Sequence, residues 1–165
     1  RLQGDWSSDV CSSDLLNKSA LLATGKISTI ICSAYMDIHK ETDICQPLQD
    51  VIDLANRSGS RFLIGVDSNA HNNLWGGVNT NRRGEFVEEF IINNNNVKVD
   101  NIGNTPTFNR ENAQTIIDLT MSSIDMEVLG WRVHEGGLSD HNLITYTVKL
   151  DSKIGRAHVW TPVTL

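Results

Sequence analysis

Residues 61–67, RFLIGVD, decide the fold of this chain. The run from Phe62 to Val66 is short and apolar, which is typical of a buried strand. The strand ends on Asp67, so it would deliver a carboxylate at its carboxyl end. A polar loop rich in Gly and Asn follows over residues 68–84, and loops of this length in compact domains are usually functional. The stretch therefore predicts a buried strand that leads into a functional loop.

The region before this strand predicts another strand and a helix. Residues 26–37, KISTIICSAYMD, are β-branched and apolar, which favours a buried strand ending near Tyr35. Residues 42–59 place apolar side chains at helical spacing, with Thr42 or Asp43 as the N-cap and Gly59 at the end. The apolar positions of this amphipathic helix are Ile44, Leu48, Val51, Ile52 and Ala55.

The region after the loop predicts a second helix and then several strands. Residues 85–95 form the helix, with Phe86, Val87, Phe90 and Ile91 inward and the Asn run 93–96 as its terminating turn. Short strands are expected around residues 97–101, 105–109, 114–123, 126–136 and 142–150. A strand, helix, strand, helix order followed by strands indicates an α/β layered fold with mixed sheets.

Composition fits one domain and excludes some classes of protein. The chain has 165 residues, 39% of them hydrophobic, and a net charge of −6 without any long basic block, so its bulk charge does not indicate DNA binding. The apolar stretches are too short to cross a membrane, which needs about 20 residues. The three cysteines, at 11, 32 and 45, form no CxxC pair, which favours a reducing, intracellular compartment.

The two ends of the chain are related through their codons. Residues 5–15 can be back-translated to a string whose reverse complement encodes residues 154–163, with Trp160 at the position of a stop codon. That string resembles a common sequencing adapter. We therefore expect residues 1–15 and 153–165 to be translated adapter and residues 16–152 to be the authentic segment. A natural tail that carries an inverted repeat is the alternative.

Three short motifs gather the residue types of a hydrolytic site. VDSNAH supplies Asp67 and Asn69, IIDLT supplies Asp118 on a strand, and LSDHN supplies Asp140 and His141. Metal-assisted phosphodiester hydrolysis needs such a set: carboxylates for a divalent cation, a histidine oriented by a carboxylate, and an amide for the phosphate. Taken singly, each residue could instead be a strand cap, a turn former or a surface group.

A serine hydrolase is a poor alternative. Ser139, Asp140 and His141 are adjacent in sequence and would not converge as a triad, and the chain has no G-x-S-x-G motif.

In their order along the chain, VDSNAH, TPTF, IIDLT and LSDHN resemble the endonuclease/exonuclease/phosphatase superfamily. DSNAHNNLWGG followed by RGEFVEEF is similar, more narrowly, to the endonuclease domain of non-long-terminal-repeat (LINE-type) retrotransposons. The resemblance covers nearly all of residues 26–150. It implies a partial four-layer α/β sandwich of deoxyribonuclease I type, with two mixed sheets flanked by helices. Residues 16–152 would be the C-terminal two-thirds of that domain, with its N-terminal part missing.

The resemblance also implies roles for individual residues. Asp67 would activate or position the attacking water, and Asn69 would hold the scissile phosphate. His141 would be the catalytic histidine, Asp118 its hydrogen-bonding partner, and Asp140 a carboxylate of the metal site.

Further positions have less defined roles. Tyr35 matches the family tyrosine that touches the phosphate, although Asp37 stands where the family often has proline. Arg82 and Arg83 are either a DNA-facing pair or plain surface charge. Two tryptophans, Trp75 and Trp131, are expected to be core or loop anchors. Thr107 lies in a matching motif without an assigned role.

The function implied by the resemblance is that of a DNA endonuclease, dependent on Mg²⁺ with Mn²⁺ as a substitute. It would nick target DNA in the nucleus as part of a polyprotein that also holds a reverse transcriptase, with no membrane partner. Another phosphatase or phosphodiesterase of this fold, or a decayed non-catalytic module, is the alternative. The family's principal metal-ligand Glu cannot be placed in the sequence, so we expect the chain as given to be an inactive fragment.

Overall fold

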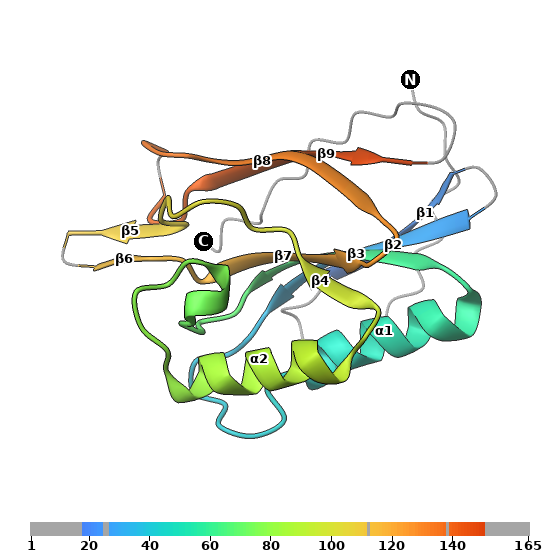
Figure 1. Cartoon of the computed structure of the whole chain (residues 1–165), viewed down its shortest axis with the longest axis horizontal. Helices are drawn as coiled ribbons and strands as arrows, with labels where there is room; N and C mark the ends of the chain where they lie inside the picture. The colour runs from blue at the N-terminus through green and yellow to red at the C-terminus, as the bar shows by residue number, and fades with distance from the viewer. Residues whose placement is uncertain (1–17, 25–26, 112, 138, 151–165) are drawn as a thin grey trace.

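A computed structural model of the chain describes residues 18–24, 27–111, 113–137 and 139–150. These residues form three layers: two helices, a central sheet and a smaller second sheet (Figure 1). The arrangement agrees with the expected α/β sandwich with two sheets. The ends expected to derive from an adapter lie outside the described residues.

The central sheet is mixed, as predicted. Its strand order is β1-β2-β3-β7-β4. Only β2 and β3 run parallel, and the other neighbours are antiparallel. The sequence did not predict the edge strand β1. The bounds are β1 Lys18–Thr24, β2 Ile27–Tyr35, β3 Arg61–Asp67, β7 Asp118–Ser123 and β4 Val97–Val99.

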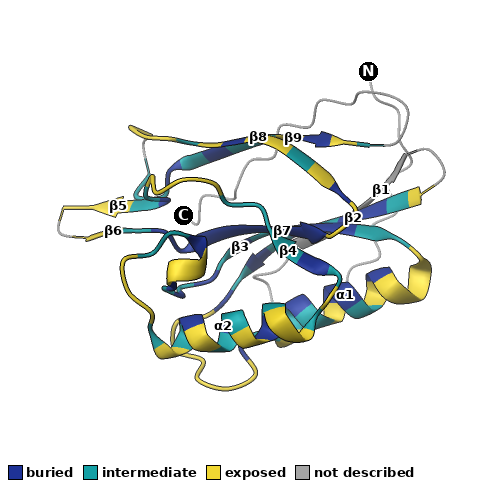
Figure 2. Cartoon of the chain, viewed as in Figure 1, coloured by how far each residue is buried: buried dark blue, intermediate teal, exposed yellow. Residues whose placement is uncertain are grey.

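Two helices cover one face of this sheet, α1 (Gln46–Ser58) and α2 (Arg82–Asn93) (Figure 1). Each helix turns its buried side toward the sheet and its exposed side outward (Figure 2). The predicted inward positions of α1 are buried: Leu48, Val51, Ile52 and Ala55. Among the described residues, no helix is long and apolar enough to cross a membrane.

The start of α1 differs from the prediction. The N-cap is Cys45, which makes no side-chain capping bond, and Pro47 lies in the first turn. Proline favours this position because its fixed φ suits the first turn and its missing N–H would have no helical partner. The expected caps, Thr42 and Asp43, therefore precede the helix. The end is as predicted, with Gly59 at φ 61° in the left-handed region.

The polar loop that follows β3 leads into the start of α2 and is hydrogen-bonded to it. Asn81 caps the helix by accepting a hydrogen bond from Gly84 N at 2.8 Å, so α2 begins earlier than predicted. The Asn81 side chain also accepts from His71 N at 3.1 Å, and Asn81 N donates to His71 O at 3.1 Å. Between these anchors lies a short 3₁₀ helix, η1 (Asn73–Trp75), whose Trp75 is buried as expected.

The second sheet lies on the face of the central sheet opposite the helices (Figure 1). It consists of β8 (Glu127–His134) and β9 (Leu143–Lys149), which pair antiparallel. Trp131 on β8 is buried and donates from Nε1 to Thr120 Oγ1 on β7 at 2.9 Å. This hydrogen bond joins the two sheets and confirms Trp131 as a core anchor.

The strand expected over 114–123 is divided in two. Its first part is β6 (Ala113–Thr115), which forms a hairpin with β5 (Phe108–Arg110), and its second part is β7. The break between β6 and β7 lies at Ile116 and Ile117. There the backbone N–H groups of Ile117 and Asp118 donate to Thr107 Oγ1, at 3.1 and 3.0 Å, instead of continuing the pairing with β5. Asp118 thereby becomes the first residue of β7.

Gly84→Ala tests the contact between α2 and the functional loop. A β-carbon at Gly84 would overlap the backbone carbonyl of His71, and backbone cannot move aside as a flexible side chain can. We expect the substitution to lower the free energy of unfolding by about 2 kcal/mol or more, measured by urea denaturation. Gly65→Ala is the matched control, because a β-carbon there meets nothing within 4 Å. Equal stability of the two variants would contradict this close packing.

Candidate active site

The register of three neighbouring strands aligns three predicted site residues. Tyr35 at the end of β2 pairs with Asp67 at the end of β3, and Asp67 pairs with Asp118 at the start of β7. Residues directly opposite each other in adjacent strands project from the same face of a sheet. The sheet therefore places one tyrosine and two carboxylates in a row at the adjoining ends of these three strands.

His141 reaches this row from the segment that leads into β9. Its neighbours are held by backbone hydrogen bonds to the TPTF region: Asn109 N donates to Asp140 O and Asn142 N donates to Thr107 O, each at 2.7 Å. The His141 ring packs edge-on against Phe108, with the ring centroids 5.0 Å apart. These contacts fix the imidazole over the start of β7, where Asp118 lies.

Thr107 positions the segments that carry Asp118 and His141, a role that the sequence did not reveal. Its hydroxyl is fully buried and accepts the amide of Asp118, and its carbonyl accepts the amide of Asn142, the neighbour of His141. The only sequence signal for this role was the place of TPTF among the ordered motifs, because the contacts join segments distant in the chain.

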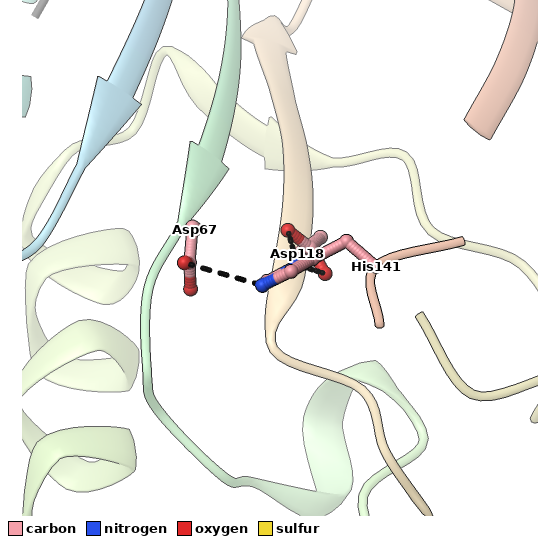
Figure 3. A group of neighbouring side chains, drawn as sticks. All are labelled: Asp67, Asp118 and His141. Atoms are coloured by element: carbon pink, nitrogen blue, oxygen red, sulfur yellow. Dashed lines mark hydrogen bonds and ion pairs between the residues drawn. The ribbon is translucent and has the colours of Figure 1, made fainter. Parts of the chain in front are cut away.

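Asp118, His141 and Asp67 form a line of interactions (Figure 3). His141 Nδ1 lies 3.0 Å from each carboxylate oxygen of Asp118. On the other side of the ring, Nε2 lies 3.8 Å from Asp67 Oδ2. Asp118 is nearly buried, and its contact with the imidazole supplies the partner that a buried carboxylate requires. The structure thus brings together three of the predicted residues.

The pKa of His141 is raised above its usual value of 6.5. The main cause is the hydrogen bond to Asp118, and the negative charges of Asp118, Asp67 and Asp140 act in the same direction, whereas burial opposes them. These negative charges therefore stabilise the protonated form of the imidazole, in which Nδ1 donates to Asp118 and Nε2 faces Asp67.

The pKa of Asp67 is raised from 3.8 to about 6, first by burial and then by the charge of Asp118. The charge of His141, the backbone amide of Asn69 and the charge of Arg83 lower it. Asp67 is thus ionised at neutral pH, yet it is a stronger base than an ordinary carboxylate, which suits proton transfer near pH 7.

Asn69 follows Asp67 in a left-handed backbone conformation, at φ 49°. Asparagine tolerates this region better than most residues. Its side-chain Nδ2 donates to Met36 O at 3.2 Å, so the amide is directed at the end of β2. Asn69 and Tyr35 therefore flank Asp67.

Asp140 lies beside the group rather than within it. Its carboxylate is partly exposed and lies 3.9 Å from Arg110 Nη2. The hydroxyl of Ser139 donates to Asp140 Oδ1 at 3.4 Å and accepts from His141 N at 3.2 Å. Ser139 thus stabilises the turn, and the imidazole binds Asp118 instead, as expected if no serine triad exists.

A metal ion could be held by Asp67, Asp118 and His141, whose ligand atoms all lie within 4.8 Å of one another. Mg²⁺ prefers carboxylate oxygens to imidazole nitrogen. Because Asp118 is engaged by His141 Nδ1, Asp67 is the carboxylate of this group best suited to Mg²⁺, and Asp140 lies outside the group.

Asp118→Asn should lower the pKa of His141, because it removes both the carboxylate hydrogen bond and the negative charge that raise it. We expect a decrease of about 1 unit or more, measured by NMR titration of the imidazole with a chelator present. Asp140→Asn is the matched control: its charge is the smallest of the contributing causes, so the decrease should be smaller. A larger decrease in the control would show that Asp118 is not the dominant partner.

Asp67→Asn should stabilise the folded protein at neutral pH. The pKa of Asp67 is about 6 in the folded state and near 3.8 in the unfolded state, so stability falls as pH rises between these values. Asparagine removes this loss, and we expect a gain of about 1–2 kcal/mol above pH 7, allowing for partial exposure of the carboxylate. Near pH 3 the two proteins should approach equal stability, because Asp67 is then mostly neutral in both states.

The measurement is the free energy of unfolding of both proteins from pH 3 to pH 8, with a chelator present. A variant that is less stable than the native protein at pH 7 would contradict the raised pKa of Asp67.

Comparisons with known proteins agree with this geometry. The chain spans 65% of the solved endonuclease domain of TRAS1, a telomere-specific non-LTR retrotransposon, with 83% of its own length aligned, a TM-score of 0.70 and 25% identity. It is also 27% identical over 137 residues, or 76% of the chain, to a 115 kDa protein in the type-1 retrotransposable element R1DM of Drosophila melanogaster, of which it covers 13%. The structural likeness confirms the expected deoxyribonuclease I-like fold. The endonuclease–reverse transcriptase family model matches residues 29–145, which is most of the sequence, and the chain therefore belongs to that family.

Proposed function

We propose that this chain carries the catalytic groups of a metal-dependent DNA endonuclease that nicks target DNA for a retrotransposon. The observation that carries the proposal is the line Asp118, His141 and Asp67, in which the outer carboxylates contact opposite nitrogens of one imidazole. Such an arrangement supplies an oriented acid beside a base, which hydrolysis of a phosphodiester by water requires.

The raised pKa values support an assignment of the proton transfers. Above about pH 6 Asp67 is ionised and can accept a proton from a water molecule, whose oxygen attacks phosphorus while the bond from phosphorus to the leaving sugar oxygen breaks. Asp118 holds Nδ1 and raises the pKa of His141, so the protonated imidazole would donate from Nε2 to that leaving oxygen. Asp118 orients the imidazole and stabilises its positive charge.

Phosphate binding is assigned to Asn69 and Tyr35, by resemblance and by their places on either side of Asp67. Asn69 carries an amide that can donate to a phosphate oxygen once it exchanges Met36 O for substrate. Tyr35 lies next to Asp67 in the register of β2 and β3. Both would hold the scissile phosphate over the two carboxylates.

The residues also fit a divalent cation. Asp67 and Asp118 face each other across paired strands, and their charges repel, which is one reason for the raised pKa of Asp67. A bound Mg²⁺, or Mn²⁺, would neutralise this charge and polarise a phosphate oxygen. By resemblance we assign Asp140 as a carboxylate of the metal site.

The wider setting is also a proposal, because the chain covers only 13% of the fly protein. We propose that it acts on DNA in the nucleus, within a polyprotein that includes a reverse transcriptase. The match to the endonuclease–reverse transcriptase family and the TRAS1 domain favour this over a phosphatase of the same fold.

Nicking of supercoiled plasmid tests the function. The proposed chemistry predicts that the purified chain converts plasmid to the open circle with Mg²⁺ and stops when a chelator removes the metal, a result that would overturn the expectation of an inactive fragment. His141→Ala should reduce the rate about 100-fold or more, because it removes the acid. His134→Ala is the matched control, since His134 is exposed on β8 and bonds only to Thr145 among the recorded contacts of the described residues.

Nicking that survives His141→Ala, or that needs no divalent cation, would contradict the proposed chemistry. A native chain that cuts nothing would contradict the proposed activity of this chain and would bear out the expectation from sequence that it is an inactive piece of the domain.

A further inference from the structure

Arg83 binds three backbone carbonyl oxygens beside the candidate active site. Its Nη1 donates to Lys40 O at 2.7 Å. Its Nη2 donates to Met36 O at 3.2 Å and to Ser68 O at 3.3 Å. Met36 follows the last residue of β2, and Ser68 follows the last residue of β3. One side chain from α2 therefore ties together the ends of the two parallel strands.

Two of these carbonyls, those of Met36 and Ser68, also adjoin Asn69. Met36 O accepts from Asn69 Nδ2 as well as from Arg83, which its two lone pairs allow. Ser68 O belongs to the peptide group that joins Ser68 to Asn69. A non-glycine residue at positive φ persists only where its surroundings hold it. Arg83 thus acts on both sides of the segment that carries the proposed phosphate ligand.

The orientation of Arg83 corrects the expectation that Arg82 and Arg83 form a surface or DNA-facing pair. Arg82 is exposed, with its guanidinium carbon 5.5 Å from the centroid of the Phe86 ring. Arg83 turns inward, and its Nε is buried without a hydrogen-bond partner in the described part of the chain. An arginine that only solubilised the surface would not lose solvation at Nε.

We propose that Arg83 is a positioning residue of the active site: it fixes the end of β2, which carries Tyr35, relative to the segment Asp67 to Asn69. The inference rests on the proposed function for its catalytic consequence. Arg83 acts through backbone carbonyls and does not touch the substrate. Its planar fork matters more than its charge, because three acceptors in different directions are bound at once.

The test compares Arg83→Lys with Arg82→Lys in the full chain. Lysine keeps the positive charge but not the fork, so charge is constant in both variants. Hydrogen exchange followed by NMR reports the local structure without any need for catalysis. In Arg83→Lys we expect the amides of Met36, Ser68 and Ala70 to exchange about 10-fold faster, because one or two charge-assisted hydrogen bonds are lost.

The amides of β8 and β9 should exchange at the native rate in both variants, and Arg82→Lys should match the native protein throughout. In the nicking assay Arg83→Lys should lower kcat about 10-fold or more with KM for plasmid unchanged, because the reacting groups are misplaced while DNA contacts remain.

Three results would overturn the proposal. Native exchange at Met36, Ser68 and Ala70 would show that Arg83 does not fix the strand ends. Faster exchange throughout the chain would show a general stabilising role. A raised KM with a weaker dependence on salt would show that Arg83 contacts DNA phosphate. If the native chain does not nick DNA, the proposed function fails, and the exchange comparison still decides whether Arg83 holds the two segments.

Discussion

The contact between Asp118 and His141 is the interaction on which the rest of the site depends. It joins the first residue of β7, in the central sheet, to the segment that enters β9, in the second sheet. The Asp118 carboxylate is nearly buried, so without the imidazole its charge would lack both a partner and solvation, which is destabilising. The imidazole in turn owes its raised pKa chiefly to that carboxylate. The pair therefore forms only where the two sheets meet.

Several parts of this fold follow from the sequence alone. The apolar run of residues 61–67 and the spacing of Leu48, Val51 and Ala55 set the buried strand β3 and helix α1, because both patterns depend only on local periodicity. The ordered motifs predicted that Asp67, Asp118 and His141 share a site, and the structure brings them within hydrogen-bonding or ion-pair distance.

Other features depend on contacts between distant residues and were not predicted. Thr107 divides an expected strand because its hydroxyl accepts amides about ten residues away. Arg83 points inward and binds Lys40 O, which lies 43 residues away in the sequence. No local pattern distinguishes Arg83 from its exposed neighbour Arg82. Hydrophobic periodicity does not predict a side chain that binds the backbone of a distant segment. The residues that such side chains position lie in recognisable motifs.

The loop after β3 has its ends pinned independently of its tip. His71 and Asn81 exchange hydrogen bonds at 3.1 Å, and buried Asn72 binds Gly84 O and Glu88, so the chain returns to α2 at a fixed point. Residues 78–80 at the tip are exposed. Insertions, deletions and substitutions there leave the path from Asp67 to His71 unchanged. The tip can therefore change in length and composition without disturbing the residues that follow Asp67.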